Sequence, residues 1–378
     1  MKFSVQKIGE LPAPVPNEKN AGVAGAFSGI IHNKLIIAGG TNFPDKKPWK
    51  GGTKIFYNKI YLFEIGKDTL QPISQPLILP EPLAYGASVS LPEGVLCIGG
   101  NGPTRCSSKV FLIRWSETDH KLIVDAYPEL PVPLSFTTAV LSENNVYVTG
   151  GSASPDALET QKYFFRLSLS KINTPLFKWE KLPPYPGLSR MFGVSVAQSN
   201  GVRECVYLFS GRNLGNPDKP VVMTDGLVYD PVLQKWDNVR ADTPASFPVM
   251  AGSAFHYGSD NIVFVGGAPD STFYKEYQLK RTLSKAVLLK PGENAANLNA
   301  ELLRFYHGHR GFSSRIFTYN TVTKRITEAG NFDGLCPVTT NVIPFRSGAI
   351  ITCGEIKPGI RTSEIYRIGL AQPASEYE

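Results

Sequence analysis

The sequence predicts an all-β fold, a six-bladed β-propeller, and three observations carry this prediction. A short apolar run that ends in glycine recurs six times along the 378 residues. A second run, rich in aromatic residues, follows most copies after some 15 to 20 residues. The two ends of the chain have the patterns of two parts of one repeat. Repeats of this period are typical of propellers, in which each repeat folds as one sheet.

The apolar runs are the first element of the repeat. Each contains about four β-branched or aliphatic residues and then glycine, which is typical of a fully buried strand that stops at a chain-breaking residue. Successive runs are about 50 to 60 residues apart, with one longer gap before the last. The six runs span residues 35–40, 95–100, 146–151, 206–211, 262–267 and 349–354.

The aromatic-rich runs predict the next strand of each blade, and a further element carries a tryptophan, Trp179 or Trp236, in two of the repeats. A strand with Gly-Gly, a strand with Tyr and a strand with Trp form the kelch signature of a four-stranded blade. Six copies therefore predict six blades. The aromatic-rich runs span residues 60–63, 110–113, 163–167, 226–229, 316–319 and 365–368.

The chain ends predict how the ring closes. The last repeat stops after residues 365–368 and lacks its outermost strand, whereas residues 3–12 at the start of the chain have the pattern of that strand. Pairing between them would close the circle by hydrogen bonds and hide both sheet edges. We therefore expect a single propeller domain over residues 1–378.

One insertion interrupts the fifth repeat. More than 40 residues separate Gly267 from the next strand near Ser314, and a second short helix is expected for residues 293–305. We expect a helical insertion at about 270–310, which either packs as a hairpin on one propeller face or forms a lid over the channel mouth. The first part of the insertion has an apolar helical face formed by Leu279, Leu283, Ala286 and Val287.

The composition of the chain limits the classes of partner that the protein is expected to bind. A chain with 42% hydrophobic residues, 35 Gly and 30 Pro suits a turn-rich β protein with a large core. No run approaches the roughly 18 apolar residues of a membrane span, so no membrane partner is expected. The net charge of +7 is dispersed without a basic stripe, which argues against nucleic acid and favours an anionic small molecule.

The spacing of the cysteines and histidines indicates which cellular compartment and which cofactors to expect. The five cysteines lack paired or metal-ligand spacing, and Cys97, Cys205 and Cys353 lie in or next to strand cores, which indicates buried thiols in a reducing compartment. No signal peptide is visible after Met1, so the default expectation is cytoplasmic, or periplasmic or secreted if a leader has been trimmed. His307 and His309 form a poor ligand set, so we expect neither a metal nor another cofactor.

The positions that directly follow the glycines are expected at corresponding places around the propeller axis. Two of the six are charged, and a carboxylate and a guanidinium that face one channel form a pocket with acid/base capacity and affinity for anions. The alternative is that Glu355 only forms a structural ion pair with Arg361 or Arg212. The six positions hold Thr41, Asn101, Ser152, Arg212, Ala268 and Glu355.

One block of the last repeat resembles a known family. The stretch Gly354-Glu-Ile-Lys-Pro-Gly-Ile-Arg-Thr362 is similar to the Gly-Glu-Ala-Lys-Pro-Gly-Leu-Arg-Thr motif of the N-acetylneuraminate epimerases, the kelch-repeat sialic acid mutarotases. Blocks that begin at Gly22, Tyr85 and Met250 resemble other family blocks. The resemblance covers essentially the whole chain, in the cyclically permuted branch, because the motif comes last instead of centrally. At Asn101 the chain departs from the family, which has a glutamate there.

The resemblance implies an isomerase without a cofactor. Such an enzyme interconverts the α and β anomers of N-acetylneuraminate by ring opening, bond rotation and reclosure in the propeller channel. It implies that Glu355 moves the proton and that Arg361 holds the substrate carboxylate.

Five further residues are expected to bind the sugar, with alternatives for some of them. Asn42 and Phe43 follow the first Gly-Gly and would form walls of the pocket, unless they only build the loop. Arg212 and Asn101 occupy equivalent channel positions, where Asn101 would alter which sugar is accepted. Arg190 heads an inner strand, where support of the fold and lining of the channel are equally expected.

Three other functions stay open from the sequence. The first is the same chemistry on another sugar or sugar acid, because the sequence hides the detail of the pocket. The second is a non-enzymatic kelch scaffold that binds a protein partner, which would not need the Glu355–Arg361 block. The third is a copper radical oxidase of the galactose oxidase type, against which the five scattered histidines argue.

Overall fold

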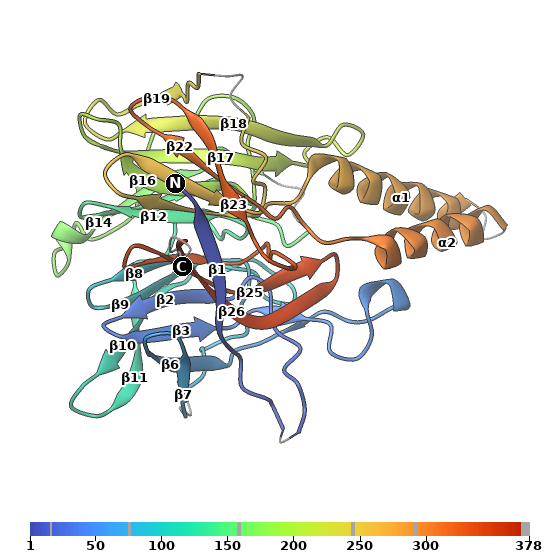
Figure 1. Cartoon of the computed structure of the whole chain (residues 1–378), viewed down its shortest axis with the longest axis horizontal. Helices are drawn as coiled ribbons and strands as arrows, with labels where there is room; N and C mark the ends of the chain where they lie inside the picture. Colours follow the sequence, from blue (N-terminus) through green and yellow to red (C-terminus); the bar gives the residue numbers. More distant parts are fainter. Residues whose placement is uncertain (16, 75–76, 157–159, 243–245, 290–292, 372–378) are drawn as a thin grey trace, which may run out of the picture.

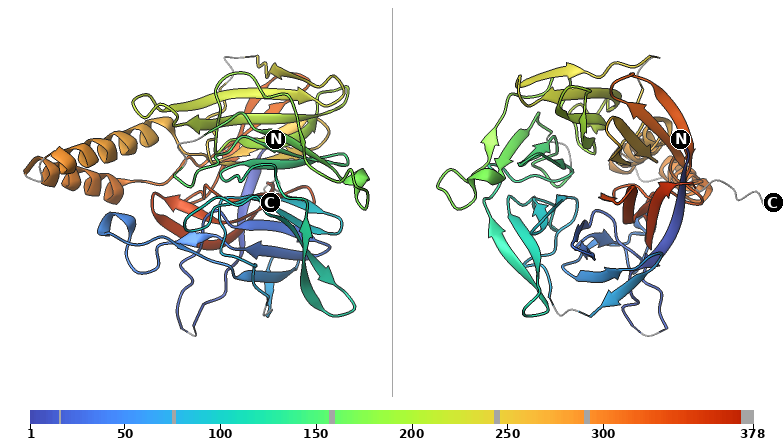
Figure 2. Two further views of the ribbon diagram at one scale, coloured as in Figure 1. Left: turned by 180° about the vertical axis from the view of Figure 1, so that it is seen from behind. Right: turned by 60° about the vertical axis from the view of Figure 1, so that its left-hand side comes forward.

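Six four-stranded antiparallel sheets surround one axis in the computed structural model (Figures 1 and 2). The structure describes residues 1–15, 17–74, 77–156, 160–242, 246–289 and 293–371. Each sheet corresponds to one sequence repeat, and the apolar run of the repeat forms its second strand. The six-bladed propeller predicted from the sequence is therefore confirmed.

The strands of blades one to five follow one another along the chain. Blade one contains β2 (Phe27–Ile31), β3 (Lys34–Ala38), β6 (Ile60–Ile65) and β7 (Leu70–Ile73). Blade two contains β8 (Ala87–Leu91), β9 (Gly94–Ile98), β10 (Val110–Ser116) and β11 (Lys121–Tyr127). Blade three contains β12 (Thr138–Ser142), β13 (Asn145–Thr149), β14 (Phe164–Ser168) and β15 (Glu180–Lys181). A short hairpin of β4 (Thr41–Asn42) and β5 (Ile55–Phe56) extends blade one.

The second half of the chain repeats this order. Blade four contains β16 (Val194–Ser199), β17 (Glu204–Asn213), β18 (Val221–Asp230) and β19 (Lys235–Asn238). Blade five contains β20 (Ser253–Tyr257), β21 (Asn261–Val265), β22 (Arg315–Asn320) and β23 (Ile326–Asn331). Blade six contains β24 (Val342–Phe345), β25 (Gly348–Lys357), β26 (Ile360–Leu370) and β1 (Phe3–Glu10). The short helices η1 (Pro48–Lys50) and η2 (Leu169–Lys171) lie in loops.

The N-terminal strand closes the ring, as predicted. β1 pairs with β26 from Phe3 opposite Leu370 to Glu10 opposite Glu364. Phe3 is buried and packs edge-on against Phe255, with ring centroids 6.1 Å apart, in the neighbouring blade five. The closing strand therefore joins blade six by its backbone and blade five by its side chains.

Burial is deepest in the second strands, because each lies between the sheets of neighbouring blades. All five residues of β9 are buried, and the Phe209 and Phe264 rings of blades four and five meet edge-on at 4.8 Å. Such aromatic pairs contribute about 0.5–1.5 kcal/mol each beyond their buried area. All five cysteines are buried and form no disulfide, which confirms the predicted burial of Cys97, Cys205 and Cys353.

A closed ring of six backbone hydrogen bonds surrounds the propeller axis. In each blade the residue shortly before the first strand donates its N–H to the carbonyl of the equivalent residue in the preceding blade, at 2.7–3.0 Å. All six have a left-handed φ between 51° and 67°. The members of this axial ring are Gly25, Tyr85, Phe136, Phe192, Ala251 and Thr339.

The helical insertion lies in blade five, as predicted, between β21 and β22. It consists of α1 (Asp270–Leu289) and α2 (Glu293–Gly308), which lie side by side and project from one end of the propeller (Figures 1 and 2). Leu279, Leu302 and Tyr306 form a small core between the helices, on which Trp49 from the loop after β4 also packs. Of the helices described, none is both long and apolar enough to cross a membrane.

Candidate active site

Two blades extend their central hairpins beyond the glycine position. In the other four blades the second strand ends at a glycine with a left-handed φ of 61° to 71°. Ser210 and Cys353 occupy this position in blades four and six, and they retain left-handed φ values of 57° and 55°. Register shifts at these points let β17 and β25 continue, so that Arg212 and Glu355 stand on extended strands.

The six positions after the glycines are structurally equivalent. Five of them form an isolated β-bridge with the residue that precedes a member of the axial ring, and the N–H of Ala268 donates to Met250 in the same way. The Cα atoms of these six residues therefore lie at about the same height along the propeller axis. Three of these six, Arg212, Ala268 and Glu355, line the cavity described next, and of the three only Arg212 and Glu355 are charged.

A cavity of about 460 Å³ lies above the axial ring, on the side of the helical insertion. We call it the charged cavity, because its described lining includes Lys54, Arg212, Lys280 and Arg361 together with three carboxylates. Tyr85, Phe136 and Phe192 of the axial ring form its aromatic floor, with ring centroids 5.0 and 4.8 Å apart. The three carboxylates belong to Asp156, Glu276 and Glu355.

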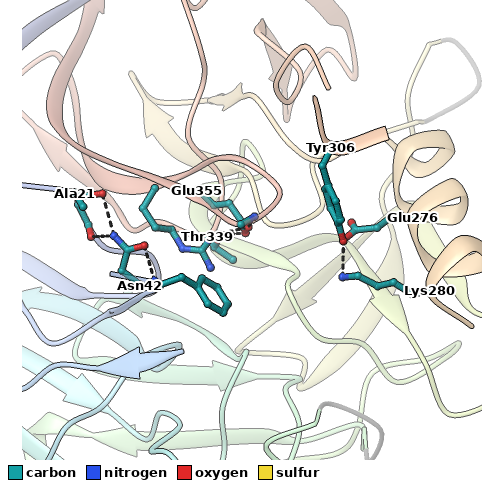
Figure 3. A network of polar contacts seen from close by, with 11 residues as sticks. Ala21, Asn42, Glu276, Lys280, Tyr306, Thr339 and Glu355 are labelled. Carbon is teal, nitrogen blue, oxygen red and sulfur yellow. Dashed lines mark hydrogen bonds and ion pairs between the residues drawn. The ribbon is translucent and has the colours of Figure 1, made fainter. Parts of the chain in front are cut away.

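Glu355 presents one anchored and one less constrained oxygen to this cavity (Figure 3). Its Oε1 accepts hydrogen bonds from the N–H of Gly359 and from Nη1 of Arg361, both at 2.7 Å. Among the described residues, only the Thr339 hydroxyl contacts its Oε2, at a long 3.4 Å. Such a carboxylate is fixed in direction while one oxygen stays available for proton transfer.

Arg361 is almost fully enclosed, with 3% of its side chain exposed. Burial lowers its pKa, but the neighbouring Glu355 carboxylate and the Tyr85 hydroxyl more than offset burial, so the pKa is raised overall. Its guanidinium also lies 5.5 Å from the ring centroid of Phe43. Arg361 therefore stays cationic and orients Glu355.

Arg212 is differently placed. Its guanidinium lies over the rings of Phe192 and Phe273, at 4.6 and 5.1 Å, and its buried Nε has no hydrogen-bond partner. Burial lowers its pKa, against the opposing effects of Glu276, Glu355 and Tyr85. No described carboxylate forms an ion pair with it, so Arg212 is a cation available to an anion in the cavity.

The helical insertion supplies a wall of the charged cavity. Glu276 accepts a hydrogen bond at Oε1 from the Tyr306 hydroxyl, at 2.9 Å, and the same oxygen forms an ion pair with Lys280 Nζ, at 2.6 Å (Figure 3). Of the two expectations for the insertion, this placement favours the one over the channel mouth. Opposite, Lys54 lies 5.4 Å from the ring centroid of Tyr85.

Two asparagines expected to bind the sugar brace the loops of the site instead. The Asn42 amide donates to the carbonyls of Ala21 and Gly22, and its Oδ1 accepts from the N–H of Phe43, so its polar atoms are used internally. Phe43 itself lines the charged cavity. The Asn101 amide donates to the Pro155 carbonyl at 3.3 Å. Both asparagines are buried and neither lines the charged cavity, so the geometry lends no support to their expected contact with the sugar.

Arg190 is placed to support the fold, which is one of the two roles expected for it, and it does not line the charged cavity. It is 1% exposed and forms a bidentate ion pair with Asp225, at 2.7 and 3.0 Å. Its Nη1 also donates to the Ser210 carbonyl at 3.1 Å. Through its bond to Ser210, Arg190 stabilises the left-handed turn that directly precedes Arg212. Asp225 and Ser210 accept the hydrogen bonds of its Nη1 and Nη2 groups.

A second cavity of about 390 Å³ lies on the other side of the axial ring, between the first strands of the blades. Its described lining is rich in Ser and Thr, and it contains no Asp, Glu, Lys or Arg. Its one titratable side chain of the acid/base type is His256, so among the described residues of the two cavities the carboxylates and the Lys and Arg cations are confined to the charged cavity on the other side of the ring. Among the described residues, no group of three or more His, Cys, Asp and Glu is placed to hold a metal ion.

The sequence did not indicate several residues of the charged cavity. Lys54, Glu276 and Lys280 had no motif beyond an i, i+4 spacing of the last two in a helix. Tyr306 directly precedes His307, and no motif of its own marks it in the sequence. Tyr85 begins a block that resembles the family, and the available signal was an aromatic residue at the equivalent place of three successive repeats, Tyr85, Phe136 and Phe192.

Comparisons with known proteins agree with this architecture. The sequence model of the family described as N-acetylneuraminate epimerase matches residues 2–124 and 127–378. Proteins named N-acetylneuraminate epimerase are 41% identical over 111 residues in Vibrio vulnificus (27% of this chain) and 37% identical over 118 residues in Vibrio cholerae (30% of this chain). The Salmonella typhimurium protein of that name is 24% identical over 242 residues, or 64% of this chain.

These matches span 28%, 31% and 57% of the length of the three relatives. The solved structure of YjhT has a TM-score of 0.63 and 13% identity, and the match covers 93% of this chain and 96% of that one. This likeness shows a shared six-bladed propeller fold.

Proposed function

Because the chain belongs to the N-acetylneuraminate epimerase family, we propose that it is an isomerase that interconverts the α and β anomers of N-acetylneuraminate in the charged cavity. The observation that carries the proposal is the environment of Glu355. Arg361 and the N–H of Gly359 hold one of its carboxylate oxygens, and the other lies in a cavity that also contains the Arg212 guanidinium, with which no described carboxylate forms an ion pair. The cavity volume of about 460 Å³ lies within the usual range for small-molecule sites.

The chemistry requires a proton to leave the anomeric hydroxyl while the ring oxygen gains one. The ring then opens to the keto acid, the adjacent C–C bond rotates, and the ring closes on the other face of the carbonyl. Glu355 Oε2 takes the proton from the anomeric hydroxyl in the first step and returns it in the last. General acid/base assistance of this kind contributes roughly 10²- to 10⁴-fold to a rate.

Arg212 is the better candidate for holding the substrate carboxylate. Arg361 already pairs with Glu355 and is enclosed, so a second carboxylate at Arg361 would compete with the proposed base. Arg212 has no ion pair within the described chain, and its planar guanidinium, stacked on Phe192 and Phe273, suits bidentate binding of a carboxylate. The partner we propose is therefore a small anionic sugar.

The test follows freshly released α-N-acetylneuraminate by proton NMR with and without the protein. We expect the approach to equilibrium to accelerate in proportion to the protein added. Glu355→Gln keeps the shape of the side chain, so it should lower kcat by about 10²-fold or more while sparing affinity. Full activity of this variant would refute the role of Glu355.

Arg212→Met separates binding from chemistry. A hydrogen bond to a charged group contributes about 1.5–3 kcal/mol, so KM should rise about 10- to 100-fold with a smaller change in kcat. Arg315→Met, which removes an exposed arginine paired with Glu328 outside the cavity, is the matched control. If the folded protein leaves the rate at the buffer value, a panel of other sugar acids and aldoses tests the same chemistry on another substrate.

A further inference from the structure

The charged cavity contains a second carboxylate in a setting that parallels that of Glu355. Glu276 from α1 has 21% of its side chain exposed, the same fraction as Glu355. Its Oε1 takes both available donors, the Tyr306 hydroxyl and Lys280 Nζ, and no described group contacts its Oε2. Each carboxylate thus has one oxygen held by a cation and a second donor, and one oxygen left for the cavity.

A continuous set of contacts connects the two carboxylates. The N–H of Gly359 donates to Glu355, and Gly359 lies so close to Trp49 that an added Cβ would come within 2.9 Å of its ring. The Trp49 ring stacks on Tyr306, with centroids 4.6 Å apart and an angle of 19°. Tyr306 in turn donates its hydroxyl to Glu276. The loop after β4 therefore fixes the helical insertion and the Glu355 hairpin in one frame.

The electrostatics of Tyr306 support this arrangement. Burial, the hydrogen-bonded Glu276 and the charge of Glu355 all raise the pKa of its phenol. Tyr306 therefore keeps its proton and remains a donor to Glu276 over the ordinary pH range. An i, i+4 pair such as Glu276 and Lys280 is often only a feature of a helix surface, but here a buried phenol and the cavity lining are added to the pair.

We propose that Glu276 is a second catalytic residue, which works with Glu355 as an acid–base pair across the charged cavity. This inference rests on the proposed function and extends it. The reaction needs one group that removes a proton from the anomeric hydroxyl and another that delivers a proton to the ring oxygen. Two carboxylates, one on blade six and one on the insertion, provide both at once.

The proton balance closes without a further reactant. In ring opening Glu355 takes the hydroxyl proton, the bond between the anomeric carbon and the ring oxygen breaks, and Glu276 in its acid form protonates that oxygen. After the C–C rotation, Glu276 takes this proton back as the oxygen attacks the carbonyl. Glu355 returns its own proton to the carbonyl oxygen, so both groups end as they began.

The test compares the pH dependence of kcat/KM for mutarotation in the whole protein and its variants. The wild-type profile should have two limbs, one for the base and one for the acid. Glu276→Gln should lower kcat about 10²-fold and remove one limb, whereas Glu355→Gln should remove the other. Glu276→Asp should retain both limbs at a lower rate, because it preserves the carboxylate.

The control is Glu301→Gln, which removes an exposed carboxylate of α2 that does not line the cavity. It should leave both limbs and the rate unchanged. If Glu276→Gln keeps both limbs, or falls in rate no more than Glu301→Gln does, the pair is wrong while the proposed function stands. If Glu276→Asp loses the same limb as Glu276→Gln, the role is structural and the proposal is overturned. If the wild-type protein does not accelerate mutarotation, the proposed function fails and the pair fails with it.

Discussion

Replacement of Gly359 by alanine tests how tightly the Glu355 hairpin is held. Gly359 lies in the turn between β25 and β26 with a left-handed φ of 76°. An added Cβ would lie 2.6 Å from Pro48 Cγ and 2.9 Å from Trp49 Cζ3. Gly359→Ala therefore forces the turn away from the loop after β4, and the N–H that anchors Glu355 moves with it.

The expected magnitude follows from three contributions. A left-handed residue with a Cβ costs roughly 1–2 kcal/mol, and overpacking typically costs 1–3 kcal/mol, so the free energy of unfolding should fall by about 2–5 kcal/mol. The 2.7 Å hydrogen bond from Gly359 to Glu355 joins a donor to a charged group, which is worth about 1.5–3 kcal/mol. Loss of that bond corresponds to a decrease in kcat of about 10- to 100-fold.

The assay pairs urea denaturation with the NMR rate of mutarotation. The matched control is Gly258→Ala, because Gly258 also has a left-handed φ, 59°, but an added Cβ there would meet nothing within 4 Å. Only the conformational cost applies to the control, and its kcat should not change. If Gly359→Ala is no less stable than the control and keeps its kcat within two-fold, the close packing of Trp49 on this turn has been misjudged.

Three further predictions concern stability. Phe3→Ala removes the ring that packs on Phe255 and should lower the free energy of unfolding in urea by about 3–5 kcal/mol; an unchanged midpoint would mean that the closing strand is not docked on blade five. Arg190→Met leaves the half-exposed Asp225 without its partner and should lower the free energy of unfolding by about 1–3 kcal/mol, while KM rises less than in Arg212→Met because Arg190 only supports the turn before Arg212; an equal rise in KM would assign Arg190 a direct contact with the substrate. Burial lowers the pKa of His309 below its ordinary value of 6.5, so the unfolded chain binds a proton first and the melting temperature should fall as pH drops through about 6.5; His309→Gln should show a smaller fall, and an equal fall would refute this origin.

The fold was predictable because each blade is specified by its own residues. The buried runs and their glycines recur at a nearly constant period, so local patterns alone determine the number of sheets and their strand order. The ring closure was predictable for the same reason, since residues 3–12 supply a strand that the last repeat lacks. No long-range information was needed for either.

The candidate site was predictable only where one contiguous block carries it. Glu355 and Arg361 lie six residues apart on one hairpin, so their proximity follows from the sequence. Glu276 and Tyr306 reach the same cavity through tertiary packing of the insertion, which no local pattern specifies. The sequence also does not show in which direction a side chain points. Arg190 points away from the cavity because it pairs with Asp225, which lies 35 residues away along the chain.

The hydrogen bonds of the axial ring affect how strongly the floor of the cavity attracts a charged ligand. Left-handed turns often leave backbone N–H groups directed into a concave site, where they attract anions. Here each of the six N–H groups is taken by the carbonyl of its neighbour, and peptide dipoles that follow one another around a circle cancel at its centre. The floor of the cavity is therefore nearly neutral toward a negatively charged ligand. Orientation of an anionic ligand is left to side chains on the loops above, which can change between related proteins without disturbing the backbone that closes the propeller.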